Sequence, residues 1–167
     1  RRAPVLTLTR EREGRTRLTY ESAGLRYDKL DPFKVRAQEA ARSTAPVLKR
    51  RGLSEVAATR GESAYAIEFP DHYLVLNEEG LGTKNLVADA TRKVTGKTYY
   101  DAIAKDTVAT IVNDLCVLGA RPIAVAAHVA CGKAEWFSDK KRSADFVSGF
   151  KDACEEAGAV WGGGETP

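Results

Sequence analysis

The stretch Tyr100–Pro122, YDAIAKDTVATIVNDLCVLGARP, decides the fold of this chain. Its large aliphatic side chains recur at helical spacing and predict one helix over residues 100–118 with a buried face. That face comprises Val108, Ile111, Val112, Leu115 and Leu118. Gly119 stands at the position of a helix-terminating glycine, and Pro122 prevents the helix from continuing. Residues 123–129 are apolar and partly β-branched, so the helix is expected to lead into a buried strand.

Short strands and further helices are expected on both sides of this helix. Upstream, a helix is expected to end near Lys49. Asp31 is suited to be its N-cap residue, and Pro32 is suited to its first helical position. Pro70-Asp71 predicts the turn of a hairpin. The other expected elements are strands at 5–9, 63–69, 73–76 and 159–161 and helices at 85–92 and 138–158. This order predicts an α+β fold, with a mixed four-stranded sheet that carries helices on one face.

The composition suits a folded domain with its own core. The chain has 167 residues, of which 29% are charged and 43% are hydrophobic. No apolar run approaches the roughly 18 residues of a membrane helix, and no secretory signal is visible. The cysteines, at 116, 131 and 154, are widely spaced, which argues against a disulfide framework and a zinc site. We therefore expect a cytoplasmic protein that does not bind membranes.

Charge is unevenly distributed along the chain. Residues 1–60 hold 15 Lys plus Arg and 7 Asp plus Glu, a net charge of +8, whereas residues 61–167 carry −5. A basic arm can attract nucleic acid. Glutamates interrupt the arginines, however, and no aromatic residues interleave for base stacking. The composition thus disfavours nucleic acid as a partner, and residues 1–18 are interpreted as a basic N-terminal extension.

The polar face of the predicted helix carries candidate ligands for a cation. Asp106, Thr110, Asn113 and Asp114 are spaced so that they share one side of a helix. Oxygen ligands without histidines suit Mg²⁺, which commonly accompanies nucleotide phosphates. A half-solvated face with ordinary salt bridges explains the same spacing, and the spacing alone leaves both interpretations open.

Two glycine-rich loops each contain a carboxylate. One is Glu78–Lys84, EEGLGTK, and the other is Gly162–Thr166, GGGET. Glycines permit a close backbone approach to phosphate oxygens, and Lys84 can neutralise their charge. Neither loop matches the Walker A pattern, and the first lacks the third glycine of a dinucleotide fingerprint. Each loop alone indicates a turn, but together with the polar helix face they indicate a phosphate site.

Four blocks carry a resemblance to a known family, and they occur in that family's order. They are TYESAGL at 19–25, EGLGTK at 79–84, Asp106 with NDL at 113–115 and GARP at 119–122, and GGET at 163–166. The chain resembles the aminoimidazole ribonucleotide synthetase family, also called phosphoribosylformylglycinamidine cyclo-ligase, over about residues 19–167. The block from Asp114 to Pro122 is shared by a wider superfamily of ATP-using enzymes.

This resemblance implies ATP-dependent ring closure of formylglycinamidine ribonucleotide to aminoimidazole ribonucleotide in purine biosynthesis, through a phosphorylated amide. It implies ATP and Mg²⁺ as cofactors, a nucleotide substrate and a homodimer whose sheets pair into a barrel. The implied catalytic residues are Lys84 and Glu165. The implied phosphate-binding residues are Gly80, Gly82, Thr83, Lys84, Asn113 and Asp114, and the implied metal ligands are Glu79, Asp106, Asp114 and Glu165.

Departures from the family pattern keep other functions open. Glu79 replaces the family's loop aspartate, which lengthens the side chain where Mg²⁺ demands strict geometry. Residues 19–167 correspond to the N-terminal domain only, so the chain alone is expected to be an inactive half of the enzyme. One alternative is another ATP-dependent member of the superfamily, such as selenophosphate synthetase, thiamine monophosphate kinase or the hydrogenase maturation enzyme. Another is a non-catalytic module that binds nucleotide or dimerises.

Overall fold

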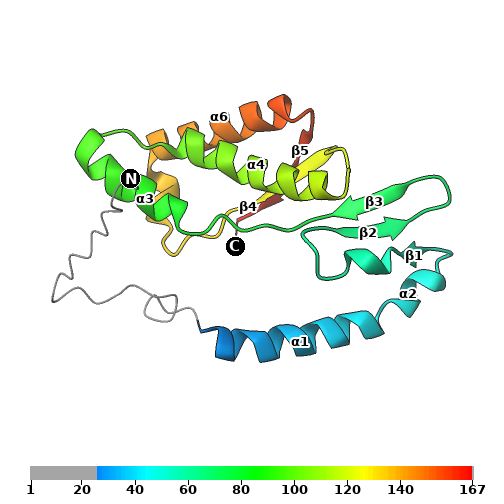
Figure 1. The fold of residues 1–167 in the computed structure, drawn as a ribbon. Coiled ribbons are helices and arrows are strands. Elements are labelled where there is room, and N and C mark those ends of the chain that lie inside the picture. The colour runs from blue at the N-terminus through cyan, green and yellow to red at the C-terminus, as the bar shows by residue number, and fades with distance from the viewer. Residues whose placement is uncertain (1–25, 167) are drawn as a thin grey trace, which may run out of the picture. The chain divides into compact units, whose positions relative to one another are not determined.

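The computed structural model of the chain describes residues 26–166 (Figure 1). It divides into two compact units, with the boundary between Thr44 and Ala45. The predicted strand at 5–9, the TYESAGL block and the basic extension at 1–18 lie outside the described residues. Within residues 26–166, no helix is both long and apolar enough to span a bilayer.

The first unit contributes helix α1, Tyr27–Ser43, which begins earlier than predicted. Arg26 is the N-cap residue, and its guanidinium donates to both carboxylate oxygens of Asp28 at 2.9 and 2.8 Å. An acidic residue in the first turn stabilises a helix start, and in α1 that residue is Asp28. Pro32 consequently lies inside the helix, where it removes one backbone donor. The predicted cap at Asp31 is therefore wrong.

The second unit begins with helix α2, Pro46–Lys49, which the prediction had joined to the preceding helix. Pro46 has no N–H, so it cannot extend the hydrogen bonding of a helix from the residues before it, but it suits the first position of a new one. A three-stranded antiparallel sheet follows, in the order β1-β2-β3, formed by Ser54–Glu55, Tyr65–Glu68 and Tyr73–Leu76. The predicted hairpin is confirmed as β2 and β3. The two-residue β1 and the 3₁₀ helix Ala57–Thr59 were not predicted, because such short segments show no periodicity.

The rest of the second unit is a helical layer over a parallel strand pair. Its elements are α3 (Lys84–Thr95), α4 (Tyr100–Val117), β4 (Ala124–His128), α5 (Glu135–Ser138), α6 (Lys140–Glu156) and β5 (Val160–Glu165). The central helix ends as predicted, with Gly119 in the left-handed region at φ 66°. Strands β4 and β5 pair in parallel, with a register shift after Val125. Helix α6 connects them as a crossover, which explains why the strands are parallel.

The strands do not form the single four-stranded sheet that was predicted. The described residues contain a three-stranded antiparallel sheet and a separate two-stranded parallel pair. A tight turn connects β2 to β3, whereas a helix connects β4 to β5. The coil at residues 77–82 and helices α3 and α4 separate the two sets along the chain. The α+β class is confirmed, whereas pairing of sheets into a barrel with a second subunit stays a prediction.

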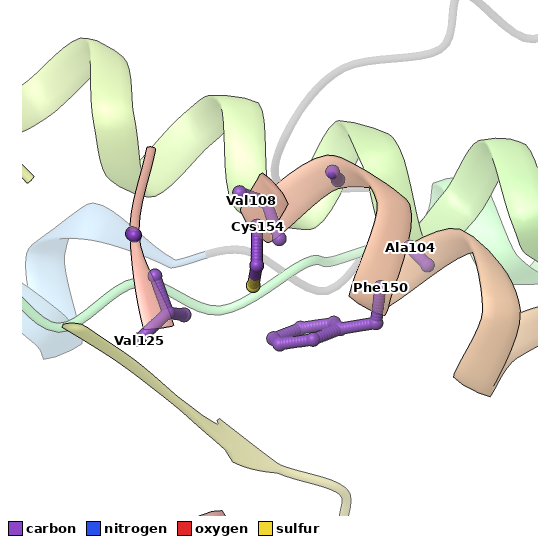
Figure 2. Close-up of a cluster of buried hydrophobic side chains, with 7 residues drawn as sticks. Ala104, Val108, Val125, Phe150 and Cys154 are labelled. Atoms are coloured by element: carbon purple, nitrogen blue, oxygen red, sulfur yellow. The ribbon is translucent and has the colours of Figure 1, made fainter. Parts of the chain in front are cut away.

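The main core lies between helices α4 and α6 and the parallel pair (Figure 2). Ala104 and Val108 from α4 meet Phe150 and Cys154 from α6, and all of them pack in one cluster with Val125 of β4. Both helices therefore cover the same face of the pair. The two helices approach very closely at Gly149, because a Cβ added there would lie 2.5 Å from the carbonyl oxygen of Asp101. This packing fixes α4, the helix that carries the predicted polar face.

Candidate functional site: a glycine loop at the start of helix α3

The first candidate feature is the glycine loop, defined as residues 78–83, which links β3 to α3. Its last residue, Thr83, is the N-cap of α3, and its side chain makes no capping hydrogen bond. No acidic residue lies in the first turn of this helix. Amides at the start of a helix lack intrahelical acceptors and carry partial positive charge. The first turn of α3 is therefore a suitable place for an anion such as a phosphate group.

Lys84 adds a positive charge at the same place. It is the first residue of α3, and its Nζ lies 2.7 Å from Oδ2 of Asp106 on α4. The two side chains are 58% and 49% exposed. Solvated pairs of this kind contribute about 0–1 kcal/mol, so little is lost when one partner is exchanged. A phosphate can thus replace Asp106 as the partner of the lysine ammonium.

The other polar residues of α4 face different surroundings. Asp114 accepts a hydrogen bond of 3.0 Å from Nδ2 of Asn77, at the end of β3. Asn113 is exposed and lines a groove between α4 and α6, beside Glu156. Thr110 donates its hydroxyl to the backbone carbonyl of Asp106 at 2.8 Å. The face predicted from spacing is therefore divided among separate contacts with α3, β3 and α6.

The predicted magnesium ligands do not gather into one site. Within residues 26–166 there is no group of three or more His, Cys, Asp or Glu side chains that could hold a metal ion. Asp106 and Asp114 are eight residues apart on one helix, about 12 Å along its axis. Asp106 is also occupied by Lys84. These carboxylates, as they lie in one chain, do not fit a magnesium ion held by protein ligands alone.

The remaining predicted carboxylates, Glu79 and Glu165, lie around the carboxyl end of β4. Glu79 lines a cavity of about 170 Å³ together with His128, which is paired in register with Glu165. Glu165 lines a second, apolar cavity of about 390 Å³. The two cavities share the lining residues Ala127, Val129, Trp136 and Phe146. The structure thus brings both glycine-rich loops to one strand end, which is where α/β proteins commonly bind ligands.

The glycines of the two loops are required for different reasons. A Cβ added at Gly164 would collide with the carbonyl oxygen of Ala127 in the neighbouring strand. By contrast, a Cβ added at Gly80 or Gly82 would meet no atom within 4 Å. Packing against β4 therefore explains why residue 164 of β5 is a glycine. The open space at the glycine loop leaves room for a ligand against the backbone.

Sequence reasoning missed Asn85, which lines the smaller cavity, and the contacts of Asp139. Oδ1 of Asn85 is buried and has no hydrogen-bond partner among the described residues, and the side chain lines this cavity. A buried acceptor without a partner suits a donor from a bound ligand or water. Asp139, the N-cap of α6, was predicted only as part of a helix start. Hydrogen bonds from Arg92 and from the Arg142 amide lower the pKa of Asp139 to about 2. Nothing in the sequence pattern indicated the contact between Arg92 of α3 and Asp139.

Comparisons with known proteins place the sequence in a family. A family model described as AIR synthase related protein, N-terminal domain, matches residues 61–167. Phosphoribosylformylglycinamidine cyclo-ligase of Thermococcus kodakarensis is 32% identical over 149 residues, covering 89% of this chain and 41% of the relative. The protein of the same name from Neisseria meningitidis serogroup C is 32% identical over 155 residues, covering 90% and 40%. That of Clostridium acetobutylicum is 39% identical over 93 residues, covering 56% and 25%.

No solved structure matches the chain. The chain spans about two fifths of the length of the first relatives it matches. The family model covers more than half of the chain and includes the glycine loop, α4 and the GGET segment. The chain therefore belongs to the family of AIR synthase related proteins and carries its N-terminal domain.

Proposed function

We propose that this chain supplies the phosphate-binding part of a cytoplasmic, ATP-dependent cyclo-ligase. The whole enzyme would convert formylglycinamidine ribonucleotide to aminoimidazole ribonucleotide in purine biosynthesis. Family membership and the shared name of the relatives support this reaction. The observation that carries the assignment is the uncapped start of α3, where Lys84 follows a glycine loop open to a ligand.

The proposed reaction has two bond-forming steps. The amide oxygen of the substrate attacks the γ-phosphorus of ATP, and the bond from that phosphorus to ADP breaks. The amidine nitrogen then attacks the activated carbon, inorganic phosphate leaves, and the nitrogen loses a proton as the ring closes. Phosphoryl transfer depends mainly on positioning and on neutralising charge. The first-turn amides of α3 and the Lys84 ammonium would supply both functions at the phosphates.

Asp106 would hold Lys84 in place before the nucleotide binds. Its carboxylate accepts from Nζ across the gap between α3 and α4. Magnesium held by the nucleotide phosphates would need only one or two protein carboxylates. Glu79 and Glu165, one from each glycine-rich loop near the carboxyl end of β4, are the proposed carboxylates.

Calorimetric titration with MgATP tests the phosphate site directly. Lys84→Ala is expected to weaken binding about tenfold or more, because a charge-assisted hydrogen bond to phosphate is lost. Lys105→Ala is a matched control, since Lys105 forms a similar exposed ion pair of 2.6 Å with Glu156. It should leave the affinity unchanged. Equal affinities of the wild type and Lys84→Ala, or absence of MgATP binding, would contradict the assignment.

We also propose that the chain forms a homodimer through its strands. Large apolar side chains are exposed on β3, just before β4, and on β5; they are Tyr73, Leu76, Ile123 and Val160. Exposed apolar patches of this kind mark interaction surfaces. Ile123→Lys is expected to raise the dissociation constant of the dimer at least about tenfold in sedimentation measurements. Val94→Lys, at an exposed position on α3, is the control. A wild-type chain that sediments only as a monomer would refute the proposal.

A further inference from the structure

The glycine loop is attached to the rest of the protein through one side chain. Of residues 78–84, all of which the structure describes, only Leu81 is partly buried, and the others are exposed. Gly80 and Gly82 on either side of it carry no side chain that could pack. The position of the loop backbone therefore depends on where the Leu81 side chain is held.

Leu81 packs against a small apolar cluster that is separate from the main core. The buried members of this cluster are Ala88 of α3 and Tyr100 and Ile103 of α4. Trp136 of α5 packs against the same cluster. Tyr100 is only 3% exposed, and its ring lies edge-on to the Trp136 indole with 5.5 Å between the ring centroids. The anchor of the loop is therefore an apolar cluster from three helices, and it includes the rings of Tyr100 and Trp136.

Arg142 of α6 holds this cluster together. Its guanidinium carbon lies 5.2 Å from the centroid of the Tyr100 ring and 5.5 Å from that of Trp136. The same guanidinium pairs with Asp89 of α3 at 3.1 Å. Asp89 in turn accepts the Tyr100 hydroxyl at 3.2 Å, and that hydroxyl accepts from the Trp136 indole at 3.5 Å. One side chain thus fixes both rings and connects α6 to α3.

The burial of Arg142 makes these contacts stronger than a surface pair. Its side chain is 17% exposed. A cation over an aromatic ring is held more strongly when it is shielded from water than at an exposed site. The planar guanidinium can lie against a ring and donate to a carboxylate at the same time, which an ammonium group cannot match. A lysine at this position would therefore keep the charge but lose much of the contact.

We infer that Arg142 is a positioning residue for the glycine loop, acting through Tyr100 and Trp136 on Leu81. This inference rests on the proposed function in assigning the loop to nucleotide phosphates. Arg142 does not touch the ligand in this role. It keeps the Leu81 anchor surface in place, so that the loop backbone is ordered before a phosphate binds. Ordering a loop in advance lowers the entropic cost of binding.

Methyl NMR of Leu81 in the full chain tests the anchor without any ligand. Packing against aromatic rings should shift the Leu81 methyl signals away from the values of an exposed leucine, and their loss in Leu81→Ala identifies them. In Arg142→Met the signals are expected to move toward exposed-leucine values. Arg60→Met is the matched control, because Arg60 also pairs with a carboxylate, Glu55, and lies 5.3 Å from the Tyr65 ring. It should leave the Leu81 signals unchanged.

The result decides the role of Arg142 whether or not the nucleotide site is correct. Unchanged Leu81 signals in a folded Arg142→Met, or equal movement in Arg60→Met, would overturn the inference. Arg142→Lys covers the case in which the methionine variant does not fold, and unchanged signals there would overturn it as well. With MgATP as the probe, Arg142→Met should weaken binding about fivefold. If the wild type binds no MgATP, the proposed function fails, while the Leu81 signals still report the anchor.

Discussion

Phe150→Ala is expected to lower the free energy of unfolding by about 4 kcal/mol, as large-to-small changes in a packed core do. Phe150 is 1% exposed and is the largest of the fully buried side chains (Figure 2). Its ring centroid lies 4.7 Å from that of Trp161 on β5 and 5.7 Å from that of Phe146. The truncation therefore leaves a cavity where α6 meets the parallel pair.

Urea unfolding followed by circular dichroism measures this loss. The fluorescence of Trp161 is less suitable, because the mutation changes its surroundings directly. Val94→Ala is the control, since Val94 is 87% exposed and its truncation should change the free energy by no more than about 0.5 kcal/mol. Similar small changes in both variants would show that Phe150 is not at the centre of the core.

Gly149→Ala is expected to destabilise the protein by about 2 kcal/mol, although alanine is the better helix former. Gly149 lies on α6 where that helix meets α4. A Cβ there would lie 2.5 Å from the Asp101 carbonyl oxygen and 2.6 Å from its Cα. Both are backbone atoms, so no side chain can rotate away, and the two helices would have to separate.

The sign of the effect makes this prediction decisive. In an isolated helix, Gly→Ala stabilises by about 1 kcal/mol. The neighbouring Ser148→Ala, at an exposed position on the same helix, should be neutral or slightly stabilising in the same urea measurement. A stabilised Gly149→Ala would mean that α4 and α6 do not approach each other as closely as the structure shows.

The sequence predicted those elements whose signals are local. The apolar spacing and Gly119 located α4 to within one residue, and Pro70-Asp71 located the hairpin. Asp31 misled the prediction of the first helix, because an N-cap residue and an acidic residue within a helix look alike in one dimension. The helix starts beside Arg26 and Asp28, which form an exposed ion pair. Local patterns thus predict the existence of an element more reliably than the residue at which it begins.

The candidate site was predicted only in its components. Helical spacing indicates which residues of α4 lie toward one side of the helix, but it does not identify their partners. Asp106 pairs with Lys84, which lies 22 residues away in the sequence. Asp114 accepts a hydrogen bond from Asn77, which lies 37 residues away. Such partners are set by the packing of α3 and β3 against α4, which no local pattern encodes. The Arg142 contacts were missed for the same reason, because they join separate helices.

The close approach at Gly164 affects how this family's sequence signature should be used. A side chain there would strike the Ala127 carbonyl oxygen of the adjacent strand, whatever the protein binds. Evolution should therefore retain this glycine even in descendants that have lost catalysis, as long as the strands still pair. A GGET segment is for that reason a marker of ancestry and fold. At Gly80 and Gly82 a side chain would meet no atom within 4 Å, so packing does not require glycine there. Substitution of these two glycines should therefore indicate a change of activity.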